Sequence, residues 1–116
     1  MKNIISLIVC LLLLTACGNS YDSINSNVAM DLIEEGAIVV DVRNVDEYNT
    51  GHIKDSINIP VDNISSVNYD KETTIIVYCA TGIRSADAAK ALIDAGYTNV
   101  YNLDGGLINW GFELEK

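Results

Sequence analysis

The chain has 116 residues, which is the length of one domain of ordinary size. Its formal charge of −9 makes it acidic, and acidic chains bind nucleic acids and anionic membrane surfaces poorly. Composition therefore argues against a nucleic-acid-binding protein and against membrane attachment through a basic patch. Histidine and cysteine do not occur at metal-ligand spacings, so we expect no metal and no other cofactor.

The first sixteen residues have the pattern of an export signal. Lys2 supplies a positive charge, and residues 4–14 are apolar except for Ser6. This run is too short to span a bilayer, which requires roughly 20 apolar residues, but it has the length of a signal-peptide core. We therefore expect residues 1–16 to be a signal peptide that is removed.

The four residues Leu14-Thr15-Ala16-Cys17 resemble a bacterial lipobox. This resemblance implies that Cys17 becomes the lipid-modified first residue of the mature protein and that residues 17–25 form a lipidated tether. The expected location is then the extracytoplasmic side of a bacterial membrane, with the lipid as the anchor. The alternative is a plain secretory signal peptide that is cut near Ala16.

Processing at this site changes the cysteine count. Cys10 leaves with the signal peptide and Cys17 is modified, so Cys79 is expected to be the one free thiol of the mature chain. A single free thiol excludes an intramolecular disulfide. An unpaired cysteine in an exported protein requires a reason, and a catalytic role is such a reason.

Strand and helix patterns alternate from residue 26 onward. Apolar β-branched runs predict strands, and periodic apolar residues that end at a glycine predict helices. The expected strands cover residues 37–42, 57–59, 74–78 and 98–103. The expected helices cover residues 26–36, 46–48, 61–67 and 85–96, and a last short helix follows 104–106.

This alternation implies one α/β domain over residues 26–116, with a parallel sheet and helices on both faces. The apolar and aromatic side chains of Leu107, Trp110 and Phe112 are expected to close its core. In parallel sheets, ligands bind at the C-terminal ends of the strands, and Asp41 and Cys79 both fall there.

The segment around Cys79 carries the strongest chemical signal. A predicted strand stops at Cys79, the loop Ala80-Thr81-Gly82-Ile83-Arg84 follows, and Ser85 is placed as the N-cap of the next helix. In such a geometry, loop N–H groups and the positive end of the helix dipole converge on the sulfur and stabilise a thiolate. Gly82 permits a turn with positive φ, and Arg84 adds a fixed cation. We therefore predict a reactive Cys79 rather than an inert buried cysteine.

Three charged residues lie at or just after the end of the first strand of the predicted domain. Asp41 and Arg43 lie at its end, and Glu47 lies four residues after Arg43, within reach across a helical turn. We interpret the three as an ion network that braces a loop rather than as catalytic groups. His52, the single histidine, is interpreted as a packed structural residue rather than a general base.

Four segments together resemble the rhodanese-like sulfurtransferases. In chain order they are VVDVR followed by EY (residues 39–43 and 47–48), GHIKDSINIP (51–60), CATGIRS (79–85), and NLDGG with a tryptophan (102–106 and 110). The resemblance extends over nearly all of residues 25–112. It implies a rhodanese-like fold, with a central parallel sheet of about five strands and helices on both faces.

The resemblance also implies an activity. A sulfane sulfur would move from thiosulfate or another persulfide source, through a Cys79 persulfide, to a thiol or to cyanide, with the N–H groups of Ala80 to Ser85 holding the terminal sulfur. The expected partners are a small sulfur donor and a thiol acceptor, and the expected state is a monomer. Ala80 is a departure, because many relatives carry a basic or polar residue directly after the cysteine. This departure is unfavourable for small anions such as thiosulfate.

Two alternatives stay open. Cysteine-dependent phosphatases and related arsenate reductases have five residues between cysteine and arginine, whereas four separate Cys79 from Arg84. The shorter loop suits a single terminal sulfur better than a phosphoryl group. Rhodanese-like folds also serve as non-enzymatic docking or sensing modules, usually without the cysteine, which this chain retains. Whether Arg84 binds an anionic donor or braces the loop is also left open.

Overall fold

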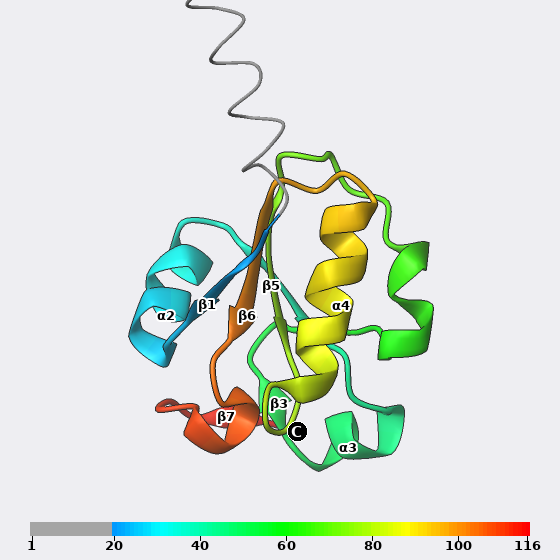
Figure 1. Cartoon of the computed structure of the whole chain (residues 1–116). Helices are drawn as coiled ribbons and strands as arrows, with labels where there is room; N and C mark the ends of the chain where they lie inside the picture. The colour runs from blue at the N-terminus through cyan, green and yellow to red at the C-terminus, as the bar shows by residue number, and fades with distance from the viewer. Residues whose placement is uncertain (1–19) are drawn as a thin grey trace, which may run out of the picture.

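The computed structural model describes residues 20–116 (Figure 1). The predicted signal peptide, the lipobox, Cys10 and Cys17 lie outside these residues. Between residues 20 and 116, no helix combines the length and the apolar character that a membrane crossing requires.

A five-stranded sheet forms the centre of the domain, in the order β1-β6-β5-β2-β4. Every strand pair in it is parallel. Its strands are β1 (Asp22–Ile24), β2 (Ile38–Asp41), β4 (Ile57–Asn58), β5 (Thr74–Tyr78) and β6 (Asn99–Leu103). The predicted fold class, an α/β domain with a five-stranded parallel sheet, is confirmed. The expected tether is corrected in part, because Asp22–Ile24 belongs to the sheet and pairs with β6.

Helices cover both faces of this sheet (Figure 1). The α-helices are α2 (Ser26–Glu34), α3 (Val45–Thr50) and α4 (Ile83–Asp94), and two 3₁₀ helices are η1 (Val61–Ser66) and η2 (Gly106–Asn109). The cluster on the α4 face includes Val40, Ile75 and Val77 of the sheet. The cluster on the α2 face includes Val39, Ile76 and Tyr78. Because successive strand residues point to opposite faces, an unbroken apolar run such as β5 supplies both cores.

A second, two-stranded sheet joins the middle of the chain to its last residues. Here β3 (His52–Ile53) pairs antiparallel with β7 (Leu114–Glu115). The sequence pattern did not predict either strand, because two residues are too few to show an alternation.

Three local predictions are wrong. Asn25 rather than Ser26 caps α2, since its side chain accepts the N–H of Val28 at 2.9 Å. Gly82 rather than Ser85 is the N-cap of α4, which therefore begins earlier than predicted. Phe112 does not close the core: it is 41% exposed and meets Trp110 edge-on. Leu107 and Trp110 do pack against the cluster on the α2 face, as expected.

Candidate active site

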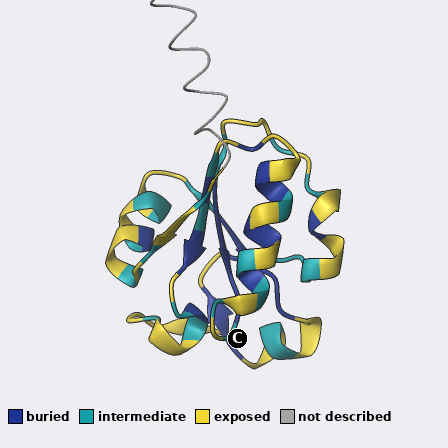
Figure 2. Cartoon of the chain, viewed as in Figure 1, coloured by how far each residue is buried: buried dark blue, intermediate teal, exposed yellow. Residues whose placement is uncertain are grey.

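Cys79 follows directly after β5, the middle strand of the sheet, and is buried. Figure 2 shows that buried residues are concentrated in the central strands, between the helices. The chain then turns through Ala80, Thr81 and Gly82 into α4. Gly82 has a φ of +99°, a left-handed conformation that side chains disfavour, and it starts the helix immediately. The sulfur therefore lies at the C-terminal edge of the sheet and at the N-terminus of a twelve-residue helix.

Backbone donors converge on the Cys79 sulfur as the sequence predicted. The N–H of Gly82 donates to Sγ at 3.0 Å and the N–H of Ser85 donates at 3.4 Å. Both groups belong to the start of α4, where backbone N–H groups have no partner within the helix. The helix dipole adds a positive potential at the same place. This arrangement favours a negative sulfur.

The pKa of the Cys79 thiol lies below its ordinary value. Burial is the largest influence and raises the pKa. Hydrogen bonds to Ser85, through its side chain and its N–H, and to the N–H groups of Thr81 and Gly82 lower it. The combined hydrogen bonds outweigh burial because the backbone N–H groups, and the Ser85 hydroxyl when its proton points to the sulfur, favour the charged form of the sulfur.

Ser85 is buried in the first turn of α4 and connects the sulfur to β6. Its Oγ lies 3.4 Å from Cys79 Sγ and donates to Oδ1 of Asn102 at 2.5 Å. Nδ2 of Asn102 donates to the carbonyl oxygen of Gly82 at 3.2 Å. Asn102 appeared in the sequence only as part of the NLDGG segment, and no pattern indicated that it contacts the loop around Cys79.

The turn after β6 packs against the same loop. The N–H of Leu107 donates to Cys79 O at 2.8 Å, and the N–H of Ile108 donates to Ala80 O at 3.2 Å. A Cβ on Gly106 would lie 2.5 Å from Cys79 O, and Gly106 has a φ of +63°. Glycine is thus required at this point both by close approach and by backbone conformation.

Arg84 pairs with Glu47 rather than remaining free. Its Nη1 and Nη2 donate to Oε1 and Oε2 of Glu47 at 2.8 and 3.0 Å. The hydrogen bond from Arg84 is the main reason why the pKa of Glu47 falls to about 2. Glu47 also forms a capping box with Asn44 at the start of α3. The pairing of Arg43 with Glu47 that the sequence suggested is therefore wrong.

Arg43 instead pairs with Asp41. The Nη2–Oδ2 distance is 2.7 Å, both side chains are buried, and Nη2 also donates to the carbonyl oxygen of Gly51 at 2.7 Å. Asn58 donates to the carbonyl oxygens of Asp41 and Arg43. These contacts hold the segment after β2 against the segment that begins at Gly51.

The contacts of His52 fit a structural role. Its ring stacks on Tyr48 with centroids 3.8 Å apart. Its Nδ1–H donates to the carbonyl oxygen of Tyr48 at 3.0 Å, and Nε2 lies 3.8 Å from a carboxylate oxygen of Glu115.

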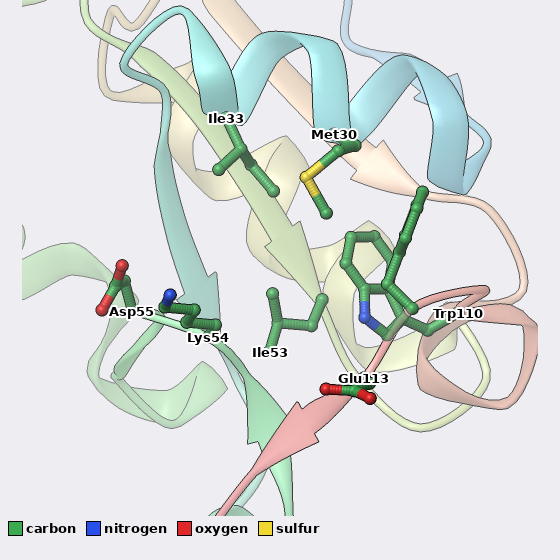
Figure 3. Close-up of a pocket in the computed structure, with 8 residues that line it drawn as sticks. Met30, Ile33, Ile53, Lys54, Asp55, Trp110 and Glu113 are labelled. Atoms are coloured by element: carbon green, nitrogen blue, oxygen red, sulfur yellow. The ribbon is translucent and has the colours of Figure 1, made fainter.

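A cavity of about 450 Å³ lies elsewhere, under α2 (Figure 3). Figure 3 shows Met30 and Ile33 of α2 opposite Ile53, with Trp110 at the side. No residue of the Cys79–Ser85 loop lines this cavity. Across residues 20–116, no cluster of three or more His, Cys, Asp or Glu side chains is arranged to hold a metal ion.

The chain is similar in sequence to one known protein family and to parts of longer proteins. The family described as the rhodanese-like domain matches residues 26–113. A tRNA uridine(34) hydroxylase of Hamiltonella defensa is 37% identical over 82 residues, which cover 64% of this chain and 23% of that protein. The corresponding protein of Yersinia pestis is 35% identical over 87 residues, which cover 68% and 24%. The chain thus spans about a quarter of the length of these relatives.

Solved structures share the fold. A rhodanese-related protein of Thermoplasma volcanium superposes with a TM-score of 0.72 at 31% identity, over 82% of this chain and 98% of that one. The human single-domain sulfurtransferase TSTD1 superposes with a TM-score of 0.72 over 78% and 96%. Its identity is 23%, so this second likeness concerns the fold.

Proposed function

The chain belongs to the rhodanese-like family, and from this premise we propose that it is a sulfurtransferase in which Cys79 carries the transferred sulfur as a persulfide. One observation carries the proposal: Sγ of Cys79 accepts hydrogen bonds from the backbone N–H groups of Gly82 and Ser85 at the N-terminus of α4. These donors stabilise the thiolate, which is the nucleophilic form of cysteine.

The reaction has two exchange steps. The Cys79 thiolate attacks the outer sulfur of a donor; with thiosulfate, a sulfur–sulfur bond forms on Cys79 and sulfite leaves with the electron pair of the broken bond. An acceptor thiolate, or cyanide in an assay, then attacks the outer sulfur of the Cys79 persulfide. The Cys79 thiolate leaves and is ready for the next donor.

The size of the loop favours sulfur over phosphate. Four residues separate Cys79 from Arg84, and the guanidinium of Arg84 is already engaged by Glu47. A phosphoryl group carries three oxygens that need donors, whereas a persulfide ends in a single sulfur. Retention of Cys79, with donors aimed at it, also argues against a purely non-enzymatic docking or sensing module.

The surroundings of the loop favour a donor that is not a small anion. Arg84 and Arg43 are paired with Glu47 and Asp41, so their charges are already balanced. Ile83 and Ile108, which flank the loop, are 75% and 77% exposed. We therefore expect an uncharged or polypeptide-borne persulfide to be a better donor than thiosulfate.

The tRNA in the names of the curated relatives is not carried over to this chain. Those proteins are about four times longer, and an acidic chain is a poor ligand for RNA. For location, we propose an exported lipoprotein anchored through Cys17 on the extracytoplasmic side of a bacterial membrane. The support is the pattern of residues 1–17 alone.

The test is the mass of the Cys79 peptide after incubation of the full chain with a donor. Thiosulfate and a neutral low-molecular-weight persulfide should be compared, with Cys79→Ser as the control. We expect one added sulfur atom on Cys79, which cyanide removes as thiocyanate. Hydrolysis of an aryl phosphate that depends on Cys79, without any sulfur uptake, would overturn the proposal in favour of a phosphatase.

A further inference from the structure

Asn102 holds two parts of the Cys79 loop with one side chain. It is buried on β6, the strand that pairs with β5. Its amide contacts Gly82 O through Nδ2 and Ser85 Oγ through Oδ1. Gly82 and Ser85 are the same two residues whose N–H groups donate to Cys79 Sγ. One amide is thus connected to both backbone donors of the sulfur.

The donor and acceptor capacities of these groups fix the direction of the hydrogen bonds among Asn102, Gly82 and Ser85. A carbonyl oxygen only accepts, so the amide nitrogen of Asn102 must face Gly82 O, and Oδ1 must face Ser85. Since Oδ1 also only accepts, the single hydroxyl proton of Ser85 points to Asn102. Ser85 Oγ therefore faces the sulfur at 3.4 Å with a lone pair, and it accepts the S–H of the resting thiol.

Ionisation of Cys79 changes what the Ser85 hydroxyl must supply. A thiolate has no proton to give, so a favourable contact requires the hydroxyl proton to turn from Asn102 toward Sγ. Oδ1 of Asn102 then loses its donor inside a buried site, which costs free energy. The hydroxyl cannot satisfy both acceptors at once.

We propose that Asn102 is a positioning residue that competes with the Cys79 sulfur for the hydroxyl proton of Ser85 while it anchors Gly82. The inference deepens the proposed function and rests on it, because it concerns the thiol that carries the sulfur. Asn102 acts through Ser85 and Gly82 and does not touch a substrate. The charged groups at this end of the sheet include the pairs Arg84–Glu47 and Arg43–Asp41 and the carboxylate of Asp104 directly after β6, and the variants below leave them intact.

The experiment is a double-mutant cycle of Asn102→Ala and Ser85→Ala on the full chain. The readout is the pH dependence of alkylation of Cys79, followed through the mass of the Cys79 peptide. Loss of Asn102 frees the hydroxyl proton for the thiolate. Asn102→Ala shifts the midpoint by some amount in each background. We therefore expect this shift to be about half to one pH unit more negative when Ser85 is present than in the Ser85→Ala background. A merely structural loosening of the loop would shift both backgrounds equally.

Two further variants sharpen the result. Asn102→Asp keeps the volume, and its carboxylate binds the hydroxyl proton more strongly, so the coupling with Ser85 should reverse in sign. The substitution removes the donor to Gly82 O and adds a charge, but both effects are common to the two Ser85 backgrounds and cancel in the cycle. It also serves if an alanine variant does not fold. Asn99→Ala is the matched control, since Asn99 lies on the same strand and donates to Glu72 O, away from the sulfur. Its midpoint should equal that of the wild type.

Equal shifts in both backgrounds would overturn the inference. Alkylation needs no sulfur donor, so the cycle is independent of persulfide formation. A wild-type chain that takes up no sulfur while the cycle shows coupling would contradict the proposed sulfur transfer and support the assignment of the hydroxyl proton. Sulfur uptake by the wild-type chain without coupling in the cycle would contradict only the assignment of the hydroxyl proton.

Discussion

Arg84 and Glu47 form a bidentate ion pair that joins the start of α4 to α3. Two parallel N–H···O contacts of 2.8 and 3.0 Å use both terminal nitrogens of the guanidinium. Such a fork has a fixed geometry, and a second anion cannot occupy it at the same time. The pair therefore favours a bracing role for Arg84 over direct capture of an anionic donor.

The first prediction tests this role. Arg84→Ala and Glu47→Ala should lower the rate of sulfur uptake by similar factors, because each breaks the same brace, and each should cost at most about 1 kcal/mol of stability. Uptake from thiosulfate and the urea midpoint should be measured for both variants. Lys90→Ala, which removes an exposed cation from α4, is the control. A loss confined to Arg84→Ala would assign donor binding to the guanidinium.

The second prediction concerns acid stability. The hydrogen bond from Arg84 lowers the pKa of Glu47 from 4.5 to about 2 in the folded chain. A lowered carboxyl pKa stabilises the fold above the unfolded value, and this contribution is lost as pH falls from about 4.5 to about 2. Urea midpoints at several pH values should show a smaller decline for Glu47→Gln than for the wild type. Parallel declines would mean that the pair contributes nothing in solution.

The third prediction concerns the thiol. The midpoint for alkylation of Cys79 should lie below the ordinary cysteine value of about 8.5, because hydrogen bonds from the side chain and N–H of Ser85 and from the N–H groups of Thr81 and Gly82 outweigh burial. Arg84→Ala should leave most of the shift in place, since none of these donors belongs to the Arg84 side chain. A wild-type midpoint at or above 8.5 would show that the loop does not stabilise a thiolate.

The fourth prediction concerns the close packing at Gly106. Gly106→Ala should abolish sulfur uptake and destabilise the domain, because the added Cβ would lie 2.5 Å from Cys79 O and 2.7 Å from Ala80 O. Gly36→Ala is a matched control: Gly36 also has a positive φ, of +103°, but no atom lies within 4 Å of its added Cβ. Gly36→Ala should lower the stability only by the backbone strain, on the order of 1 kcal/mol, and the variant should retain activity.

The fifth prediction concerns the anchor. Cys17→Ser should move the protein from the membrane to a soluble exported fraction, because it removes the proposed site of lipid attachment. Fractionation followed by detection of the protein measures the change. Unchanged membrane association in the variant would exclude a lipid on Cys17.

Local patterns were sufficient to predict the central part of this domain. The apolar run before Cys79 predicted β5, and Gly82 and the alanine-rich segment after it predicted a tight turn into a helix. These signals are local, since they depend on propensity and periodicity over a few residues. The position of the thiol at a helix N-terminus followed from them.

The partners of the loop residues were not predictable in the same way. Arg84 binds a carboxylate 37 residues away, and Ser85 binds an amide 17 residues away. Which residues meet at such separations depends on the order of strands in the sheet. Serine is also a favoured N-cap, so Ser85 was placed at the helix start, whereas its hydroxyl is taken by Asn102 on β6.

The parallel direction of the strands has a consequence for an anchored chain. β1 enters the sheet at Asp22, five residues after Cys17, and five residues of chain reach about 18 Å at most. β5 runs in the same direction as β1 through β6, so Cys79 lies at the far edge of the sheet from the point where β1 begins (Figure 1). A lipid on Cys17 would thus hold the domain close to the bilayer with the thiol facing away from it, where the thiol would be open to sulfur donors and acceptors in the aqueous phase.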